Sequence, residues 1–362
     1  MKHKPQSLTS LPLSGSLALT AAVAVFVSIA PVSLTADENA TSGAPTNSTE
    51  TAADETTAAS KPAPKRSALT ADQVFGKVKA QLDSLQGFSC DIRQTVFMTG
   101  HRLQARGRYY HASGNRLRLE YRLFPIRAVK AGDKEYLSID SDGEDTTELK
   151  PTGSLTQVSD GSVLWTYWIN AGQKQLTRRN IREIMEAADA EPNYSAATSL
   201  SDLGVGGMQT LMAQLQVGMD FGAVLEQESA RGPLLMVTGR WNDRTRAEVF
   251  KLPPEADGPM PDYIPDYVRV YVTAATMTPA RIQYVKRHPN PDIKQVRPLA
   301  TLDFMNFKAE NEIPAAVFEF ERPDDEEITE VDLTSDVLEA IKKAGAKPGT
   351  KPDDEAEESA DQ

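Results

Sequence analysis

The sequence predicts an α+β fold, in which one helix precedes a long antiparallel meander of strands with helices inserted midway. The first observation behind this prediction is a capping box, because Thr70 and Gln73 open a stretch with apolar residues at helical spacing. The second is a series of closely spaced turns, such as Asp160-Gly161, between segments that read as strands. A sheet of this size is large enough to curl, with helices covering one side.

The elements are expected in the order of the chain. A helix begins at Thr70 and ends at Gly87, and hairpins then connect strands at 88–98, 102–111 and 116–124. A second meander runs from about 135 to 179, and residues 180–220 have the pattern of two or three helical pieces.

The second half of the folded part returns to strands. These are expected at 223–229, 234–241, 267–274, 280–287, 298–308 and 316–322, with short helices at 242–250 and 335–344.

Residues 1–36 have the layout of a secretory signal peptide. A positively charged start precedes a nearly unbroken apolar run at 17–30, and Ala36 is the expected cleavage point. The run is short for a membrane-spanning helix. Because Leu34 stands where a smaller residue is preferred, an uncleaved N-terminal anchor is left open as the alternative. Both interpretations predict export to the periplasm or cell envelope.

The remaining boundaries follow from composition. Residues 37–69 are rich in Ala, Thr, Ser and Pro, which predicts a disordered linker. The folded domain is then expected over residues 70–333, and residues 334–362 are expected to form an acidic C-terminal tail.

Charge and cysteine usage exclude several classes of function. The formal net charge of −12 repels phosphates, so no nucleic-acid partner is expected. Cys90 is the only cysteine, and it alternates with polar residues in a strand-like segment. We interpret Cys90 as a buried packing residue, with a reactive thiol as the alternative.

The sequence shows no pattern that supports catalysis. The four histidines lack metal-ligand spacing. Residues 140–145 loosely resemble a calcium loop, but the bidentate Glu is missing and a solvated turn is favoured. No nucleophile motif is present. We therefore predict that the protein is not an enzyme and carries neither a metal nor a cofactor.

The aromatic segment at 165–168 admits two interpretations. Trp165 and Tyr167 project to one face of their strand, and Trp168 projects to the other. Either a helix packs on one face and a second contact covers the other, or one face lines a cavity for an apolar ligand.

Three ordered stretches carry a family resemblance. They are LQGFS (85–89) with RQT (93–95), VSDG (158–161) with LWTY (164–167) and QLT (175–177), and NEIP (311–314) with FEF (318–320) and Pro323. With this set, most of residues 70–333 resembles the LolA-like lipoprotein carrier family, whose relatives include LolB and the stress sensor RseB.

The resemblance implies a strongly curved antiparallel half-barrel, with helices covering the concave side over an apolar cavity for acyl chains. It implies a carrier of lipid or of an acylated lipoprotein, with transient or tethered membrane contact. The alternative is an RseB-like sensor that uses the same fold to bind an envelope protein. The family's lid arginine is absent, because His111, Ala112 and Ser113 stand at its place. The chain also lacks the lipidated Cys of LolB.

Large apolar and aromatic side chains in the expected strands and helices are the candidates for lining this cavity. They are Leu119, Tyr121, Phe124, Trp165, Tyr167, Leu211, Leu215, Leu235, Met236 and Phe304. A shift of one residue in register would move each strand's set to the other face.

Overall fold

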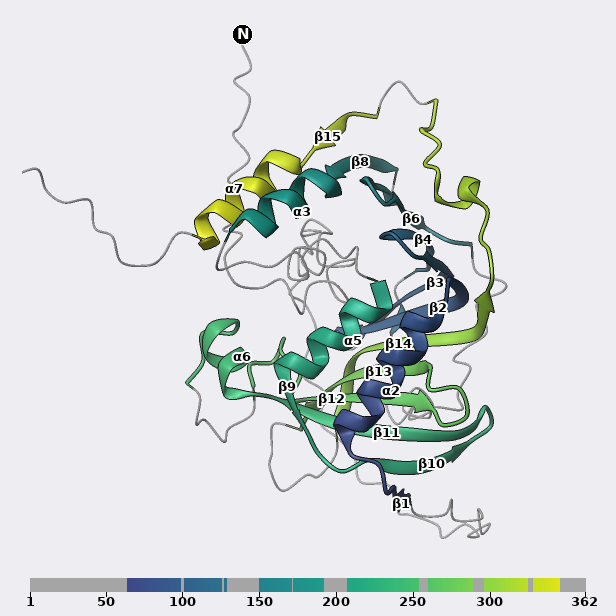
Figure 1. Cartoon of the computed structure of the whole chain (residues 1–362), viewed down its shortest axis with the longest axis vertical. Helices are drawn as coiled ribbons and strands as arrows, with labels where there is room; N and C mark the ends of the chain where they lie inside the picture. Colours follow the sequence, from purple (N-terminus) through teal and green to yellow (C-terminus); the bar gives the residue numbers. More distant parts are fainter. Residues whose placement is uncertain are drawn as a thin grey trace, which may run out of the picture.

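One open, curved sheet of fifteen strands forms the body of the described protein (Figure 1). This computed structural model describes residues 64–98, 101–125, 127–128, 150–170, 172–191, 207–253, 260–288, 296–324 and 328–345. The expected signal peptide, most of the expected linker, the 140–145 turn and the tail beyond 345 lie outside these residues. The prediction of an α+β protein with a large curved sheet is confirmed.

Neighbouring strands in the described sheet pair antiparallel, except β15, which runs parallel to β8. The order is β1-β10-β11-β12-β13-β14-β2-β3-β4-β6-β7-β8-β15, with β5 beside β3 and β9 beside β11. The strands are β1 (Lys65–Arg66), β2 (Gly87–Met98), β3 (His101–Ala112), β4 (Arg116–Leu123), β5 (Arg127–Ala128), β6 (Gly153–Asp160), β7 (Val163–Asn170), β8 (Gln173–Asn180), β9 (Met219–Phe221), β10 (Leu225–Ser229), β11 (Gly232–Trp241), β12 (Tyr267–Thr273), β13 (Pro279–Arg287), β14 (Val296–Glu310) and β15 (Glu330–Asp332).

Four helices make two separate pairs on the sheet. α2 (Ala71–Ser84) lies beside α5 (Gly207–Gly218), over the strands in the middle of the order. α3 (Ile181–Ala190) lies beside α7 (Thr334–Gly345), near β8 (Figure 1). The short α6 (Asp243–Glu248) and the 3-10 turn η2 (Ala315–Phe318) complete the described elements. We call the face on which α2 and α5 pack the covered face.

α2 forms because its sequence provides hydrogen bonds for its first turn and apolar residues for its buried side. The Thr70 side chain accepts from the backbone N–H of Gln73, and the Gln73 side chain accepts from that of Thr70, so the predicted capping box is confirmed. Val74, Val78 and Leu82 are almost fully buried. The helix ends at Ser84, three residues before the predicted Gly87, because Leu85 is already extended.

The predicted strand at 316–322 is wrong. Residues 315–318 form η2 instead, and no strand is assigned at 319–322. Arg118 Nη1 donates to the carbonyls of Val317 and Glu319, at 3.2 and 3.3 Å. Phe318 is buried against Ala112 and Ile313. A distant arginine and a local apolar anchor therefore hold this segment, rather than a strand partner.

Described residues after β14 contact the face opposite to the covered face, and β15 lies at the far edge of the sheet. Phe320 stacks on Trp165 with ring centroids 5.2 Å apart, and β15 then pairs with β8. Arg178 Nε lies 3.2 Å from a carboxylate oxygen of Asp332. α7 follows and buries Ile341 in the same core as α3. We call residues 311–324 and 328–333 the C-terminal strap.

Gly107 of β3 occupies a position where only glycine fits. A Cβ there would lie 1.5 Å from the backbone oxygen of Glu120 in β4, whereas a Cβ on Gly76 of α2 would meet nothing within 4 Å. We predict that Gly107→Ala lowers the free energy of unfolding by more than about 2 kcal/mol, because the strands must separate. The matched Gly76→Ala should raise it by about 0.5–1 kcal/mol, since Ala favours the helix. Denaturant unfolding measures both, and equal effects of the two changes would contradict this account.

Candidate functional site

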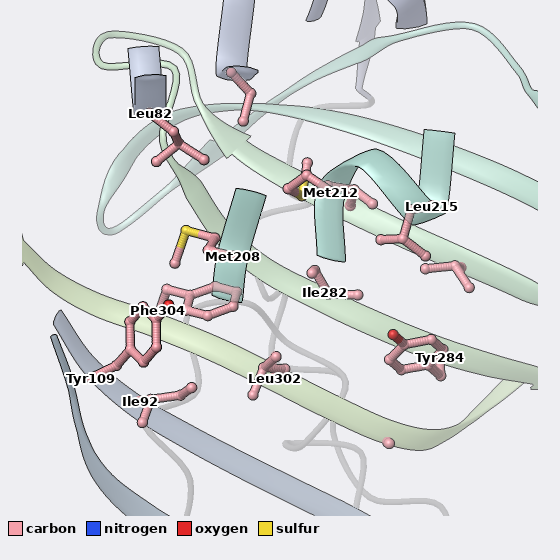
Figure 2. Close-up of a cluster of buried hydrophobic side chains, with 14 of the residues drawn as sticks. Leu82, Ile92, Tyr109, Met208, Met212, Leu215, Ile282, Tyr284, Leu302 and Phe304 are labelled. Carbon is pink, nitrogen blue, oxygen red and sulfur yellow. The ribbon is translucent and has the colours of Figure 1, made fainter. Parts of the chain in front are cut away.

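The covered face is the largest apolar surface of the described protein, and its strands contribute in rows. One row of paired residues runs from Ile92 of β2 through Gly107 of β3 to Tyr121, Leu155 and Trp168, and it lies on this face. Figure 2 shows how Met208, Met212 and Leu215 of α5 and Leu82 of α2 project onto it. Below them lie Ile92, Tyr109, Ile282, Tyr284, Leu302 and Phe304 (Figure 2).

Burial is incomplete where the sheet passes from one helix pair to the other. Leu119 of β4 and Trp168 of β7 are only partly buried, although both pack against the main core. Met185 of α3 and Leu211 of α5 are partly buried in the same way. We call Leu119, Tyr121, Leu155 and Trp168 the inner strip. Within this strip Tyr121 and Leu155 are buried, and helix packing leaves Leu119 and Trp168 partly exposed.

A polar cluster sits beside the inner strip, at the start of α5. The Tyr109 hydroxyl lies 3.5 Å from His111 Nδ1 and also accepts the backbone N–H of Met208. Gly207 has a φ of 57°, and a Cβ there would lie 2.0 Å from the Tyr109 hydroxyl oxygen. Position 207 therefore requires glycine for two reasons. Residues with a side chain avoid this φ, and the Tyr109 hydroxyl leaves no room for a Cβ.

Burial controls the ionisation of these groups. It lowers the pKa of His111, which packs against the ring of Phe88, to about 4. Burial, followed by the charge of Asp91, raises the pKa of Cys90 to about 12. It also raises the pKa of Tyr109 and that of Tyr121. His111 is thus neutral at pH 7, and the Cys90 thiol is protonated and 1% exposed, as expected for a packing residue.

The ten predicted lining residues do not share one surface. Leu119, Tyr121, Leu235 and Phe304 lie on the covered face, and Leu211 and Leu215 reach it from α5. Trp165, Tyr167 and Met236 lie on the opposite face, and Phe124 follows the end of β4. Their role in ligand binding stays a prediction. The sequence set the two faces of each strand apart, but it did not indicate which face the helices cover.

The two faces of the aromatic strand have different contacts, and the interpretation that one face lines a ligand cavity stays a prediction. Trp168 packs with the core of the covered face, and Phe320 of the C-terminal strap covers Trp165 on the other side. Sequence reasoning missed the polar residues of the covered face, among them Gln157, Thr166 and Arg179. Their alternation with outward-facing residues in β6, β7 and β8 is the signal that could have indicated them.

A hollow of about 700 Å³ lies where α2 begins and α5 ends. Its wall includes Arg66, Thr70 and Asp72, and its apolar part includes Met219 and Val224 of the main core. Its volume falls in the range of small-molecule sites, but its lining is polar as well as apolar. Besides the inner strip, this hollow is a second place where a ligand could reach the interior, and it lies at the opposite end of α5 from Gly207.

No protein-family model matches the sequence, and no curated protein matches it. Several solved structures are similar at low identity. An outer membrane lipoprotein-sorting protein domain from Vibrio parahaemolyticus is 8% identical, with a TM-score of 0.28 over 68% of this chain and 94% of its own. A DUF1329 family protein from Desulfovibrio piger is 10% identical, with a TM-score of 0.28 over 68% of this chain and 96% of its own.

MucB, in its complex with MucA(peri), is 9% identical, with a TM-score of 0.29 over 70% of this chain and 60% of its own. The neighbours thus include a lipoprotein-sorting domain, the kind of protein that the sequence resembles. Within the described ranges, no helix is both long enough and apolar enough to span a bilayer.

The partly buried His111 makes stability depend on pH. Its folded pKa, about 4, is below the unfolded value near 6.5, so the folded state disfavours the proton. The contribution of neutral His111 to the free energy of unfolding is fully present above pH 6.5. As the pH falls toward 4, this contribution is lost, and the loss is on the order of 3 kcal/mol. We predict that His111→Phe flattens the fall in unfolding free energy between about pH 7 and pH 4. A wild-type slope in His111→Phe would contradict this assignment.

Proposed function

We propose that this chain is an exported lipid- or lipoprotein-binding protein, a periplasmic carrier that holds an acyl chain against the inner strip. In this proposal the covered face is the concave side of a half-barrel, and the two helix pairs form its cover. The observation that carries the proposal is the partly buried apolar surface of Leu119 and Trp168 between the helix pairs. Apolar surface left partly open on an otherwise buried face is what a lipid site requires.

The energetics suit binding that can be reversed. Transfer of about 15 methylenes from water contributes roughly 12 kcal/mol, at about 0.8 kcal/mol for each. A carrier must offer a comparably apolar surface, or the lipid stays in the membrane. Met185 and Leu211 lie on different helix pairs, so a shift of one pair relative to the other would change the exposure of the strip. In this mechanism helix movement opens the site only when a ligand or membrane takes up the exposed surface.

Purification of the full chain from an envelope fraction, followed by mass spectrometry of the molecules that stay bound, tests the proposal. We expect acylated molecules near one per protein. Recovery of a protein partner without acylated molecules would overturn the carrier and favour an RseB-like sensor. We propose that the protein has no catalytic role. Turnover of envelope lipids by the purified chain would contradict this proposal.

The inner strip and the opposite face offer a matched pair of variants. We predict that Leu119→Gln weakens displacement of a fluorescent fatty-acid probe by palmitate at least tenfold, because it places an amide in the strip. Tyr167→Gln, on the opposite face of β7, should leave displacement unchanged. Both residues are only partly buried, so both variants should fold. Equal loss in the two variants, or no loss in Leu119→Gln, would contradict the inner strip as the site.

A further inference from the structure

The covered face changes from apolar to polar along a single row of paired residues. Tyr109 and Leu119 begin the row on β3 and β4, and Gln157, Thr166 and Thr177 continue it on β6, β7 and β8. Gln157 Nε2 donates to Thr166 Oγ1 at 3.4 Å. The same face therefore offers an apolar surface at β4 and hydrogen-bonding groups at β8.

Arg179 lies at the polar end of this face. It pairs across strands with Leu164, which belongs to the main core, so its side chain starts on the covered face. Its neighbour Arg178 starts on the opposite face, where it lies over Trp165 and pairs with Asp332. The side chains of these two consecutive arginines therefore project to different faces of the sheet.

Arg179 is partly buried, and burial lowers its pKa. Among the residues that the structure describes, no carboxylate makes an ion pair with it, so no neighbouring negative charge offsets this effect. Two nearby carboxylates have other partners, since Asp332 pairs with Arg178 and Glu183 accepts from the Asn180 side chain. A desolvated guanidinium without a counter-charge is costly, and groups perturbed in this way are concentrated at functional sites.

We infer that Arg179 binds the anionic head group, a carboxylate or a phosphate, of an amphiphile whose chain lies along the inner strip. The inference rests on the proposed function and deepens it by naming the head-group class. A guanidinium presents paired N–H donors that match both anions. From β4 to β8 there are three strand spacings, about 14 Å in total. Head group and chain can therefore occupy one face, with Gln157, Thr166 and Thr177 along the way.

Three amphiphiles with one chain length separate the contributions of head and tail. Palmitate, hexadecyl phosphate and uncharged hexadecanol compete with a fluorescent acyl probe for the full chain at about pH 8. We expect both anions to bind the wild type at least tenfold more tightly than hexadecanol. In Arg179→Gln this preference should fall to about twofold or less, while the affinity for hexadecanol stays within about twofold of wild type. Arg179→Lys should keep part of the preference, because it retains the charge without the paired donors.

Arg182→Gln is the matched control, because it removes an equal charge from an exposed position on α3. It should keep the wild-type preference, and the thermal midpoint of each variant reports folding separately. Equal binding of all three amphiphiles by the wild type would overturn the role of Arg179 and leave the acyl site standing. An unchanged preference in Arg179→Gln would do the same. Failure of the wild type to bind any amphiphile would overturn both the proposed function and this inference. A preference for one anion alone would support the inference and identify the head group.

Discussion

Burial of one face of the sheet beneath α2 and α5 is the interaction on which the other elements depend. Successive residues of a strand project to opposite faces, so a sheet that buries one face must still cover or solvate the other. α5 is placed by Gly207, whose close approach to Tyr109 sets where the helix begins. α2 is placed by its capping box and by the short connection from Leu85 into β2. With these constraints Leu119 and Trp168, at the two ends of the inner strip, stay partly exposed.

The opposite face is covered by different chemistry. Asp303 of β14 accepts hydrogen bonds from Arg93 of β2 and Arg281 of β13, and all three are nearly fully buried. Toward β8, the C-terminal strap covers this face through Phe320 and through the carbonyls that Arg118 binds. Because α7 follows the strap and packs beside α3, the end of the chain links the two faces. In the described residues, polar, aromatic and a few apolar contacts such as those of Leu234 and Met236 hold the opposite face, and the covered face carries the main apolar core.

Local signals explain which elements could be predicted from the sequence. The hairpins from 88 to 124 depend on turn residues and alternation within a few positions, and β2, β3 and β4 match them closely. The segment at 316–322 has strand-like alternation, but Arg118, almost two hundred residues earlier in the chain, fixes its carbonyls. β1 at Lys65–Arg66 falls within the expected linker but forms a strand, because it pairs with β10. Composition alone could not indicate this distant partner. The choice of face at Trp165 and Trp168 likewise depends on helices distant in sequence.

The central claim is that an acyl chain lies on the covered face beside Trp168. The chain has three tryptophans, so each of two double variants retains a single tryptophan, on one face or the other. Trp165→Phe with Trp241→Phe retains Trp168, and Trp168→Phe with Trp241→Phe retains Trp165. Titration of both proteins with a fatty acid brominated along its chain measures contact, because bromine quenches tryptophan fluorescence at short range. We predict saturable quenching of Trp168 with Trp165 unaffected, whereas quenching of Trp165 alone, or of neither residue, would contradict the claim.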